Sequence, residues 1–234
     1  MLPAIDNFVK LFIIVPAFNE SAVINKVIRS LPKKIKGISQ VNKLVIDDGS
    51  FDETAQKAKN AGVQVIRHSI NRGVGAATKT GFEVAKMENA DIIVTLDADG
   101  QHDTKDIQKI IDPIIKKKSD VVIGSRFKKL QKVPKDRLVL NWLANFATFA
   151  IFGVFSTDSQ SGFRAFSKKA LELIDIKSDR MEFSSELLHE ANKNKLKVKE
   201  VSIKAIYTSY SRQKGQKNTN ALPIFSRFLM KFLR

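Results

Sequence analysis

The chain alternates short apolar runs with segments of helical periodicity, and this alternation constrains its fold more than any other feature. The apolar runs occupy residues 11–15, 43–46, 63–66, 92–96 and 120–124. Between them, apolar residues recur at helical spacing in residues 20–31, 50–61, 73–89 and 107–115. Continuous apolar runs are typical of strands that are buried on both faces. The pattern predicts an α/β domain with a mostly parallel sheet and helices on both of its faces.

The later part of the chain is predicted to extend this domain. Residues 162–167 and 198–207 have the pattern of strands, and residues 183–194 have that of a helix. A short helix is expected to follow the first of these strands and to end near residue 173. Ser50 and Glu53 have the spacing of a capping box for the helix that follows them.

Polar residues follow four of the predicted strands at the point where each strand ends. These segments are residues 16–20, 47–48, 71–72 and 97–101. In open parallel sheets, ligands bind in the crevice beyond the carboxyl ends of the strands. The sequence therefore predicts a binding site at this edge.

Among these segments, Asp97-Ala98-Asp99 carries the clearest chemical signal, and it directly follows the fourth apolar run. Two carboxylates one residue apart repel each other unless a cation lies between them. Oxygen ligands of this kind suit Mg²⁺ or Mn²⁺, and Mg²⁺ commonly binds one or two carboxylates together with substrate phosphates. Taken alone, the motif is equally compatible with a solvated acidic turn.

The formal net charge of +16 and the absence of cysteine narrow the classes of function. Such a basic chain suits nucleic acid, an anionic membrane or phosphorylated substrates as partners. Nucleic acid is disfavoured because the basic residues flank apolar stretches and no nucleic-acid motif is present. A dinucleotide-dependent dehydrogenase is also disfavoured, since residues 71–77 hold only two glycines and lack the G-x-G-x-x-G fingerprint. A chain without cysteine fits a reducing compartment.

Residues 126–137 are strongly basic, and residues 138–155 then carry no charge. Asn141, Asn145 and Thr148 fall on one face of the helix that this uncharged run predicts, and Trp142 is a plausible anchor at a membrane interface. We expect an amphipathic helix that lies on or partly in a membrane surface. A buried core helix has the same periodicity and stays an alternative.

Seven motifs extend this interpretation. The chain carries VPAFNE at 15–20, DDGS at 47–50, NRGVGAA at 71–77, DADGQH at 97–102, DSQSGFR at 158–164, EFSSELL at 182–188 and SYSRQKGQK at 209–217. Together they closely resemble the inverting, nucleotide-sugar-dependent glycosyltransferases of family 2. Their order resembles the polyprenyl-phosphate branch, which includes the dolichol-phosphate mannose and glucose synthases. This resemblance covers residues 10–217 and implies a GT-A fold with a Rossmann-like central sheet.

The resemblance also implies roles for the matching positions. Asp99 and Arg126 would be the catalytic residues, and Asp97, Asp99 and Gln101 would hold Mg²⁺ or Mn²⁺. The nucleotide sugar would contact Pro16, Ala17, Asn19, Glu20, Asp47, Asp48, Asn71, Gly73, Lys79, Asp97, Ala98 and Asp99, with Arg212, Lys214 and Lys217 on a loop over its diphosphate. Independently of the resemblance, the chemistry of an anionic acceptor predicts contacts with Arg126, Arg137 and Arg164. Glu182 and Glu186 are expected to line the acceptor site or to contact the sugar hydroxyls, and pairing with nearby basic residues is their alternative. For the loop that holds Arg212, a solvated basic segment is the alternative.

Two further expectations concern neighbours of these residues. Asp158 is expected to orient Arg164 or the sugar. His102 is expected to be a hydrogen-bonding neighbour or a surface residue, and a metal ligand is the alternative. Gly100-Gln101 stands where the mannose synthases are expected to have a Leu-Ser-type pair, so the motif does not identify the sugar.

The expected acceptor is a polyprenyl or dolichyl phosphate. A phosphate monoester has its second pKa at about 6, so it is largely a dianion at neutral pH. Such an oxyanion needs no general base to attack the sugar; it needs cations that hold it beside an anionic donor, and arginine offers bidentate pairing. A related transferase with a sugar hydroxyl as acceptor is the nearest rival, and it would need a general base.

We expect one GT-A domain over residues 1–217, in which residues 126–157 form a basic, amphipathic insertion that faces acceptor and membrane. A basic amphipathic helix over residues 218–234 is expected to lie on an anionic membrane surface. The N-terminus lacks the pattern of a signal peptide. These features predict a peripheral membrane protein on the cytoplasmic face.

Overall fold

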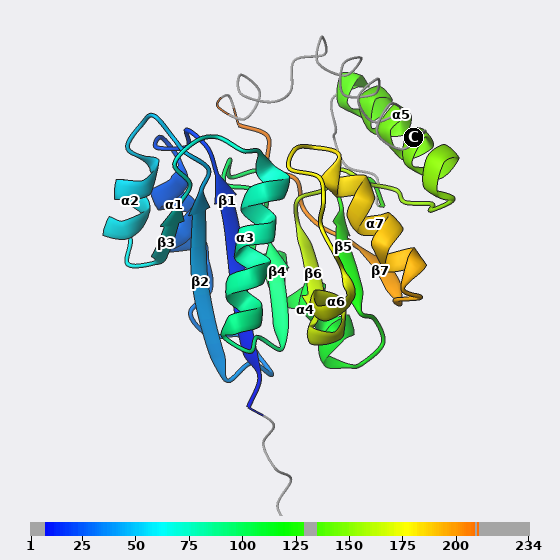
Figure 1. The fold of residues 1–234 in the computed structure, drawn as a ribbon, viewed down its shortest axis with the longest axis horizontal. Helices are drawn as coiled ribbons and strands as arrows, with labels where there is room; N and C mark the ends of the chain where they lie inside the picture. Colours follow the sequence, from blue (N-terminus) through cyan, green and yellow to red (C-terminus); the bar gives the residue numbers. More distant parts are fainter. Residues whose placement is uncertain (1–7, 129–134, 209, 211–234) are drawn as a thin grey trace, which may run out of the picture.

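The computed structural model describes residues 8–128, 135–208 and 210. Its centre is a seven-stranded sheet with the order β3-β2-β1-β4-β6-β5-β7 (Figure 1). The strands are β1 (Lys10–Ala17), β2 (Gln40–Asp47), β3 (Gln64–Arg67), β4 (Ile92–Thr95), β5 (Val121–Ser125), β6 (Arg164–Ser167) and β7 (Val198–Ser202). The first five strands lie where the apolar runs predicted them, so the predicted α/β class is confirmed.

The strands are parallel with one exception. β2 pairs with β1 and β3, β4 pairs with β1, and β7 pairs with β5, all in parallel. β6 runs antiparallel between β4 and β5 and separates these two strands. Because Ala17 lies opposite Asp47 and Asp47 opposite Arg67, the polar ends of β1, β2 and β3 lie beside one another at one edge.

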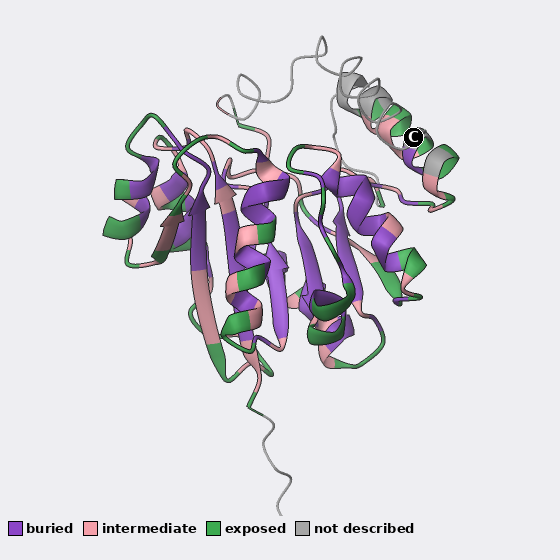
Figure 2. Cartoon of the chain, viewed as in Figure 1, coloured by how far each residue is buried: buried purple, intermediate pink, exposed green. Residues whose placement is uncertain are grey.

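Helices cover both faces of the sheet (Figure 1). They are α1 (Ile24–Ser30), α2 (Thr54–Asn60), α3 (Val74–Met87), the 3-10 helix η1 (Thr104–Asp106), α4 (Ile107–Ile115), α5 (Lys135–Phe152), α6 (Lys168–Leu173) and α7 (Phe183–Lys193). In β1, Leu11, Ile13 and Val15 pack with the core on the side of α1 and α4, whereas Phe12 and Ile14 pack with the core on the side of α3, α6 and α7. Figure 2 shows the buried strands between these helices. Burial on both faces explains why β1 has no polar alternation.

Helix α5 lies outside the two helix layers (Figure 1). Asn141 and Asn145 both donate to the backbone oxygen of Thr157 at 2.9 Å, and Thr148 shares a hydrogen bond with Ser185. Trp142 is 63% exposed, and Leu143, Phe146 and Phe149 are also exposed. The polar face therefore binds the domain and the apolar face is open, which excludes the alternative of a buried core helix.

Two other predictions change. α2 begins after Glu53 without a side-chain cap, because Ser50 instead donates to Asp47 and accepts from the backbone of Asn19. β7 ends at Ser202, earlier than predicted, and the chain then crosses to the segment after β4, where Ile206 donates to the backbone oxygen of Gln101.

Two observations bear on the membrane prediction. The predicted helix over residues 218–234 lies outside the described residues. Among the helices of the described part, none is long and apolar enough to cross a membrane.

Candidate active site

The carboxyl ends of β1 and β2 form the first wall of the site. Pro16 and Ala17 close β1, and the backbone N–H of Asp48 donates to the oxygen of Ala17 at 2.8 Å. The buried carboxylate of Asp47 lies 3.1 Å from Nε of Arg67 and accepts from Ser50. Sequence order placed these residues at one edge, and the pairing of β1 with β2 brings them together.

Asp48 is surrounded by donors from the protein itself. Its carboxylate accepts from the backbone N–H groups of Gly73 at 2.7 Å and Arg72 at 3.0 Å, and from the side-chain amide of Asn71 at 2.9 Å. Nδ1 of His68 lies 2.7 Å from the same carboxylate. Asp48 therefore holds the segment 71–73 in place, a structural role that the sequence did not predict.

Gly73 could not be replaced without rearrangement. Its φ is +117°, a value that side chains disfavour, and an added Cβ would overlap the backbone oxygen of Asp179. The loop that contains Ser178 and Asp179 also packs on Gly75, where an added Cβ would overlap the backbone oxygen of Ser178. Close packing of this loop on the start of α3 thus explains both glycines, while Lys79 is exposed one turn further along α3.

The segment after β1 is held by the segment after β2. Asn19 has a φ of +54°, and its Oδ1 accepts from the backbone N–H of Phe51 at 2.8 Å. The backbone N–H of Glu20 donates to Thr54, and its carboxylate accepts from the hydroxyl of Tyr210 at 2.8 Å. Burial and this contact with Glu20 raise the pKa of Tyr210. Tyr210 thus brings the later part of the chain to the predicted nucleotide pocket.

Asp97 and Asp99 follow β4 with different surroundings. Oδ2 of Asp97 lies 3.0 Å from Nε2 of His102, and 42% of the Asp97 side chain is exposed. Asp99 accepts from the backbone N–H of Gln101 at 2.9 Å and from its side-chain amide. His102 is thus the hydrogen-bonding neighbour that we expected, and its ring lies 5.1 Å from that of Phe163.

The two carboxylates have opposite pKa shifts. Burial raises the pKa of Asp97, but the hydrogen bond with His102 and the positive charges of Arg126 and Arg164 outweigh it and hold that pKa below its usual range. For Asp99, burial and the negative charge of Asp97 raise the pKa. Two nearby carboxylates that disfavour each other's charge are a suitable place for a cation.

The Asp97 carboxylate lies in the space that a side chain at position 162 would occupy. An added Cβ at Gly162 would lie less than 3.0 Å from Cγ and from both carboxylate oxygens of Asp97, closer than Cβ atoms are found to approach. Thr95 also donates to the backbone oxygen of Gly162 at 2.9 Å. The turn before β6 therefore lies against the end of β4, because β6 pairs with β4.

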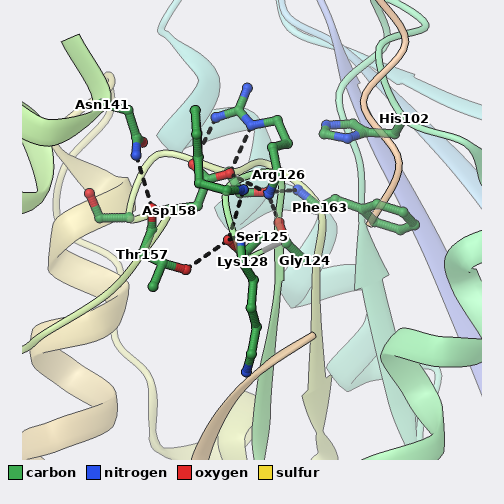
Figure 3. Close-up of polar contacts among 12 residues, drawn as sticks. His102, Gly124, Ser125, Arg126, Lys128, Asn141, Thr157, Asp158 and Phe163 are labelled. Atoms are coloured by element: carbon green, nitrogen blue, oxygen red, sulfur yellow. Dashed lines mark hydrogen bonds and ion pairs between the residues drawn. The ribbon is translucent and has the colours of Figure 1, made fainter. Parts of the chain in front are cut away.

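Arg126 follows β5 and is bound by Asp158. Its Nε and Nη2 donate to the two carboxylate oxygens, each at 2.8 Å, and its backbone N–H donates to the same group at 3.0 Å (Figure 3). Asp158 is fully buried, and the Arg126 side chain is 20% exposed. Burial lowers the pKa of Arg126, but the hydrogen bonds and charge of Asp158 outweigh it and raise that pKa. Asp158 forms its ion pair with Arg126, a partner that the sequence did not predict, and its charge also acts on Arg164. Its predicted role in orienting the sugar stays a prediction.

Arg164 begins β6 and is almost fully buried. Its Nη2 donates to the backbone oxygen of Ser159 at 2.6 Å, and its guanidinium lies 5.9 Å from the ring of Phe183. Its Nε and Nη1 have no hydrogen-bond partner among the described residues. Burial lowers its pKa to about 10, although the charges of Asp158 and Asp97 oppose the shift. A buried cation with unused donors suits an anionic ligand.

Glu186 differs from its predicted role as an acceptor-binding residue. Its two carboxylate oxygens accept from the backbone N–H groups of Lys177 at 3.0 Å and Ser178 at 2.8 Å. This carboxylate therefore fixes the loop that packs on Gly73 and Gly75, and we correct its role to a structural one. Glu182 lies one turn earlier, directly before α7, and is partly exposed.

The other predicted basic residues of the site lie outside the side chains that the structure describes. Arg137 lies on α5, but its side chain is not described. Arg212, Lys214 and Lys217 lie outside the described residues. No group of three or more acidic or histidine side chains in the described part could hold a metal ion alone, so a cation there would need ligands from Gln101 or from a substrate.

The site also contains residues that the sequence analysis did not single out. His68, Gly162, Glu200 and Tyr210 all contact predicted site residues or the loops that hold them. Gly162 lies inside the motif DSQSGFR, which was the one signal available for it. Tyr210 likewise lies inside the motif SYSRQKGQK. His68 and Glu200 make contacts between distant parts of the chain, which spacing does not reveal.

An α/β sheet whose carboxyl edge carries two acids beside Arg126 and the buried Arg164 agrees with the glycosyltransferase class that the motifs predicted. The chain matches glycosyl transferase family 2 over residues 12–174, and it belongs to this family. The motifs had predicted this membership and the transferase activity that comes with it.

Two relatives and one solved structure support the assignment. The chain is 40% identical to the UDP-N-acetylglucosamine–dolichyl-phosphate N-acetylglucosaminyltransferase of Methanococcus voltae, over 94% of this chain and 95% of that protein. It is 30% identical to the polyprenol monophosphomannose synthase of Mycolicibacterium smegmatis, over 82% and 75%. Its fold matches glucosyl-3-phosphoglycerate synthase from Mycobacterium tuberculosis in complex with Mn²⁺, uridine diphosphate and phosphoglyceric acid, with a TM-score of 0.73, 18% identity and coverage of 96% and 77%.

Proposed function

We propose that this glycosyltransferase moves a monosaccharide from a nucleotide sugar to a polyprenyl or dolichyl phosphate, with inversion at the anomeric carbon. The observation that carries the proposal is the shared cluster of Asp97, Arg126 and Asp158. Asp97 follows the donor-side strand β4, and Arg126 is close enough for its charge to lower the pKa of that carboxylate. A donor diphosphate and an acceptor phosphate would therefore meet at this cluster.

The donor side of the site is assigned to the ends of β1, β2 and β4. Pro16, Ala17, Asn19 and Glu20 would border the base and ribose, and Asn71 and Gly73 would complete the pocket. Asp47, Asp48 and Lys79 are also assigned to the donor pocket. Asp48 would contribute indirectly, because its carboxylate binds Asn71 and Gly73 and holds the segment 71–73 in place. Ala98, Arg212, Lys214 and Lys217 are assigned to the diphosphate by the family resemblance.

The carboxylates after β4 fit a divalent cation. Asp97 is partly exposed, and the raised pKa of Asp99 reflects repulsion that a cation would relieve. Asp97, Asp99 and Gln101 would hold Mg²⁺ or Mn²⁺, which when bound neutralises charge on the leaving nucleoside diphosphate. The relatedness of the fold to a synthase solved with Mn²⁺ and uridine diphosphate supports this proposal.

The surroundings of the acids favour a phosphate acceptor over a hydroxyl. A hydroxyl acceptor needs a general base within hydrogen-bond reach. The pKa of Asp97 is held low, which makes it a weak base, and Asp158 is engaged by three N–H groups of Arg126. A phosphate dianion supplies its own nucleophilic oxygen and needs cations, which Arg126 and Arg164 offer. Arg137 is assigned to the acceptor by the same phosphate chemistry.

The protein would meet its lipid-linked acceptor at a membrane surface. Trp142, Leu143, Phe146 and Phe149 give α5 an exposed apolar face, which is typical of helices that lie in the membrane interface. We propose that α5 and the segment 218–234 attach the protein peripherally to the membrane. We place it on the cytoplasmic face, since a chain without cysteine fits that reducing compartment. Nucleic acid is not among the partners that we propose.

A transfer assay tests this function. Purified protein, Mn²⁺ and vesicles that contain dolichyl phosphate are incubated with labelled UDP-N-acetylglucosamine, UDP-glucose or GDP-mannose. The named Methanococcus relative makes UDP-N-acetylglucosamine the first donor to test. We expect label in a lipid phosphate that mild acid cleaves. No labelled lipid with any donor, in the presence of transfer to a sugar hydroxyl, would contradict the proposal.

A further inference from the structure

The loop of residues 156–159 connects three separate parts of the molecule. It lies between β7, helix α5 and the residues that follow β5 (Figure 3). Each of its four residues makes a hydrogen bond to a residue more than ten positions away. A loop with so many contacts is held in one conformation, because each bond opposes the entropy of the free loop.

Glu200 on β7 makes the most contacts with this loop. Its Oε1 accepts from the hydroxyl of Ser156 at 2.7 Å and from the backbone N–H of Thr157 at 2.8 Å. Its Oε2 accepts from the hydroxyl of Thr157 at 2.6 Å. Hydrogen bonds to an ionised carboxylate are stronger than those between neutral groups. Glu200 therefore fixes the two residues that precede Asp158.

Helix α5 holds the other side of the loop. Asn141 and Asn145 donate to the backbone oxygen of Thr157, and Oδ1 of Asn145 accepts from the backbone N–H of Ser159 at 2.8 Å. Asn145 thus binds the chain on both sides of Asp158. The same helix carries the exposed apolar face, so the loop joins that face to the site.

Asp158 connects the loop to Arg126. Its carboxylate binds Nε and Nη2 of the guanidinium, which leaves Nη1 without a hydrogen bond among the described residues. Figure 3 shows that nitrogen on the side of the guanidinium turned away from Asp158. An arginine side chain has several rotatable bonds, so fixing one edge of the guanidinium decides where the other edge points.

We propose that Glu200 and Asn145 are positioning residues for the acceptor: through the 156–159 loop and Asp158 they set the direction in which Arg126 offers its free N–H groups to an anionic phosphate. This inference rests on the proposed function, because it takes Arg126 as the group that binds the acceptor. It assigns Glu200 no contact with either substrate.

Kinetics with separate donor and acceptor titrations test the proposal. Glu200→Gln keeps the size of the side chain and removes its charge, and we expect an acceptor KM about tenfold higher, equivalent to about 1.4 kcal/mol, with the donor KM unchanged. Asn145→Ala, on the other side of the loop, should act in the same direction. The matched control is Glu190→Gln, which makes the same change at a carboxylate outside the 156–159 loop, where it binds Lys193 on α7. An unchanged acceptor KM, or a parallel rise of both KM values, overturns the proposal.

A spectroscopic measurement separates this inference from the proposed function. The Nε–H signal of Arg126, assigned with the Arg126→Lys variant in protein labelled with ¹⁵N-arginine, reports the hydrogen bond to Asp158 without any substrate. Glu200→Gln should shift this signal and speed its exchange with water, while Glu190→Gln should not. If the wild-type protein transfers no sugar to lipid phosphate, the proposed function fails, yet the shift still shows that Glu200 positions Arg126. An unchanged Arg126 signal overturns the positioning role even where transfer occurs.

Discussion

Replacement of Gly162 by alanine tests whether the position of Asp97 controls activity. The added Cβ would lie less than 3.0 Å from three atoms of the Asp97 carboxylate, whereas ordinary van der Waals contact begins at 3.4 Å. The carboxylate would have to move, since the Gly162 backbone is held by a hydrogen bond from Thr95. The change adds one methyl group, and the contact between Asp97 and His102 would shift with the carboxylate.

The magnitude follows from this overlap. Relief of the contact requires a displacement on the order of 1 Å, and misplacement of this size at a reacting centre lowers rates by about 10²-fold. The overlap is with the end of a side chain that is 42% exposed, so the cost in folding free energy should not exceed about 1 kcal/mol, the lower end of the range for overpacked cores. For a chain of this length, each kcal/mol lowers Tm by roughly 2–4 °C. We therefore expect a folded protein with a severe loss of kcat/KM.

The assay measures kcat/KM for the donor, the Mn²⁺ concentration at half-maximal rate, and Tm by thermal melting. Gly62→Ala is the matched control, because Gly62 has a φ of +80° and no atom near its Cβ position. It lies before β3, at the end of the sheet opposite the site. The strained alanine should reduce stability by about 1 kcal/mol and leave the activity of the folded protein unchanged.

Two results would refute the reasoning. Activity of Gly162→Ala within about twofold of wild type would show that the position of the Asp97 carboxylate does not limit the reaction. An equal loss of activity in Gly62→Ala would show that lowered stability, and not displacement of Asp97, explains the defect.

Three further predictions concern separate parts of the site. Asp99→Asn removes a charge that a cation would bind, so turnover should fall at least about 10²-fold and Mn²⁺ affinity with it, measured by calorimetry; unchanged affinity would contradict the metal assignment. Arg126→Lys cannot form the two bonds that Nε and Nη2 make with Asp158, so the acceptor KM should rise about tenfold while the donor KM stays constant. Trp142→Ser should weaken sedimentation with anionic vesicles. Met87→Ser, at an apolar residue that is even more exposed at the end of α3, should not; equal effects would refute the role of α5.

The sequence by itself determined the α/β class and the location of the site. A strand buried on both faces must be apolar throughout, so the runs over 11–15 and 120–124 identify β1 and β5 without further information. Because parallel strands end at one edge, the polar residues after β1, β2 and β4 had to converge. The spacing of Asn141, Asn145 and Thr148 also predicted which face of α5 is polar, since helical periodicity is local.

Only the tertiary structure decided how the acidic residues are paired. Asp158 and Arg126 are separated by 32 positions, and their contact depends on β6 running antiparallel between β4 and β5. The same insertion places Gly162 against Asp97. The spacing of residues along the sequence predicts which of them are neighbours on one strand or helix. It does not predict which loop packs against which strand.

The same reason explains the role of Glu186 and the partners of Asp48. Both carboxylates were expected to face a ligand, yet each accepts from backbone N–H groups of a nearby loop. Backbone donors occur at every position except proline, so no motif marks them. The sequence determined that acids gather at this edge, and the folded chain decided which of them hold loops and which remain open to a cation, because that depends on where the backbone donors lie in space.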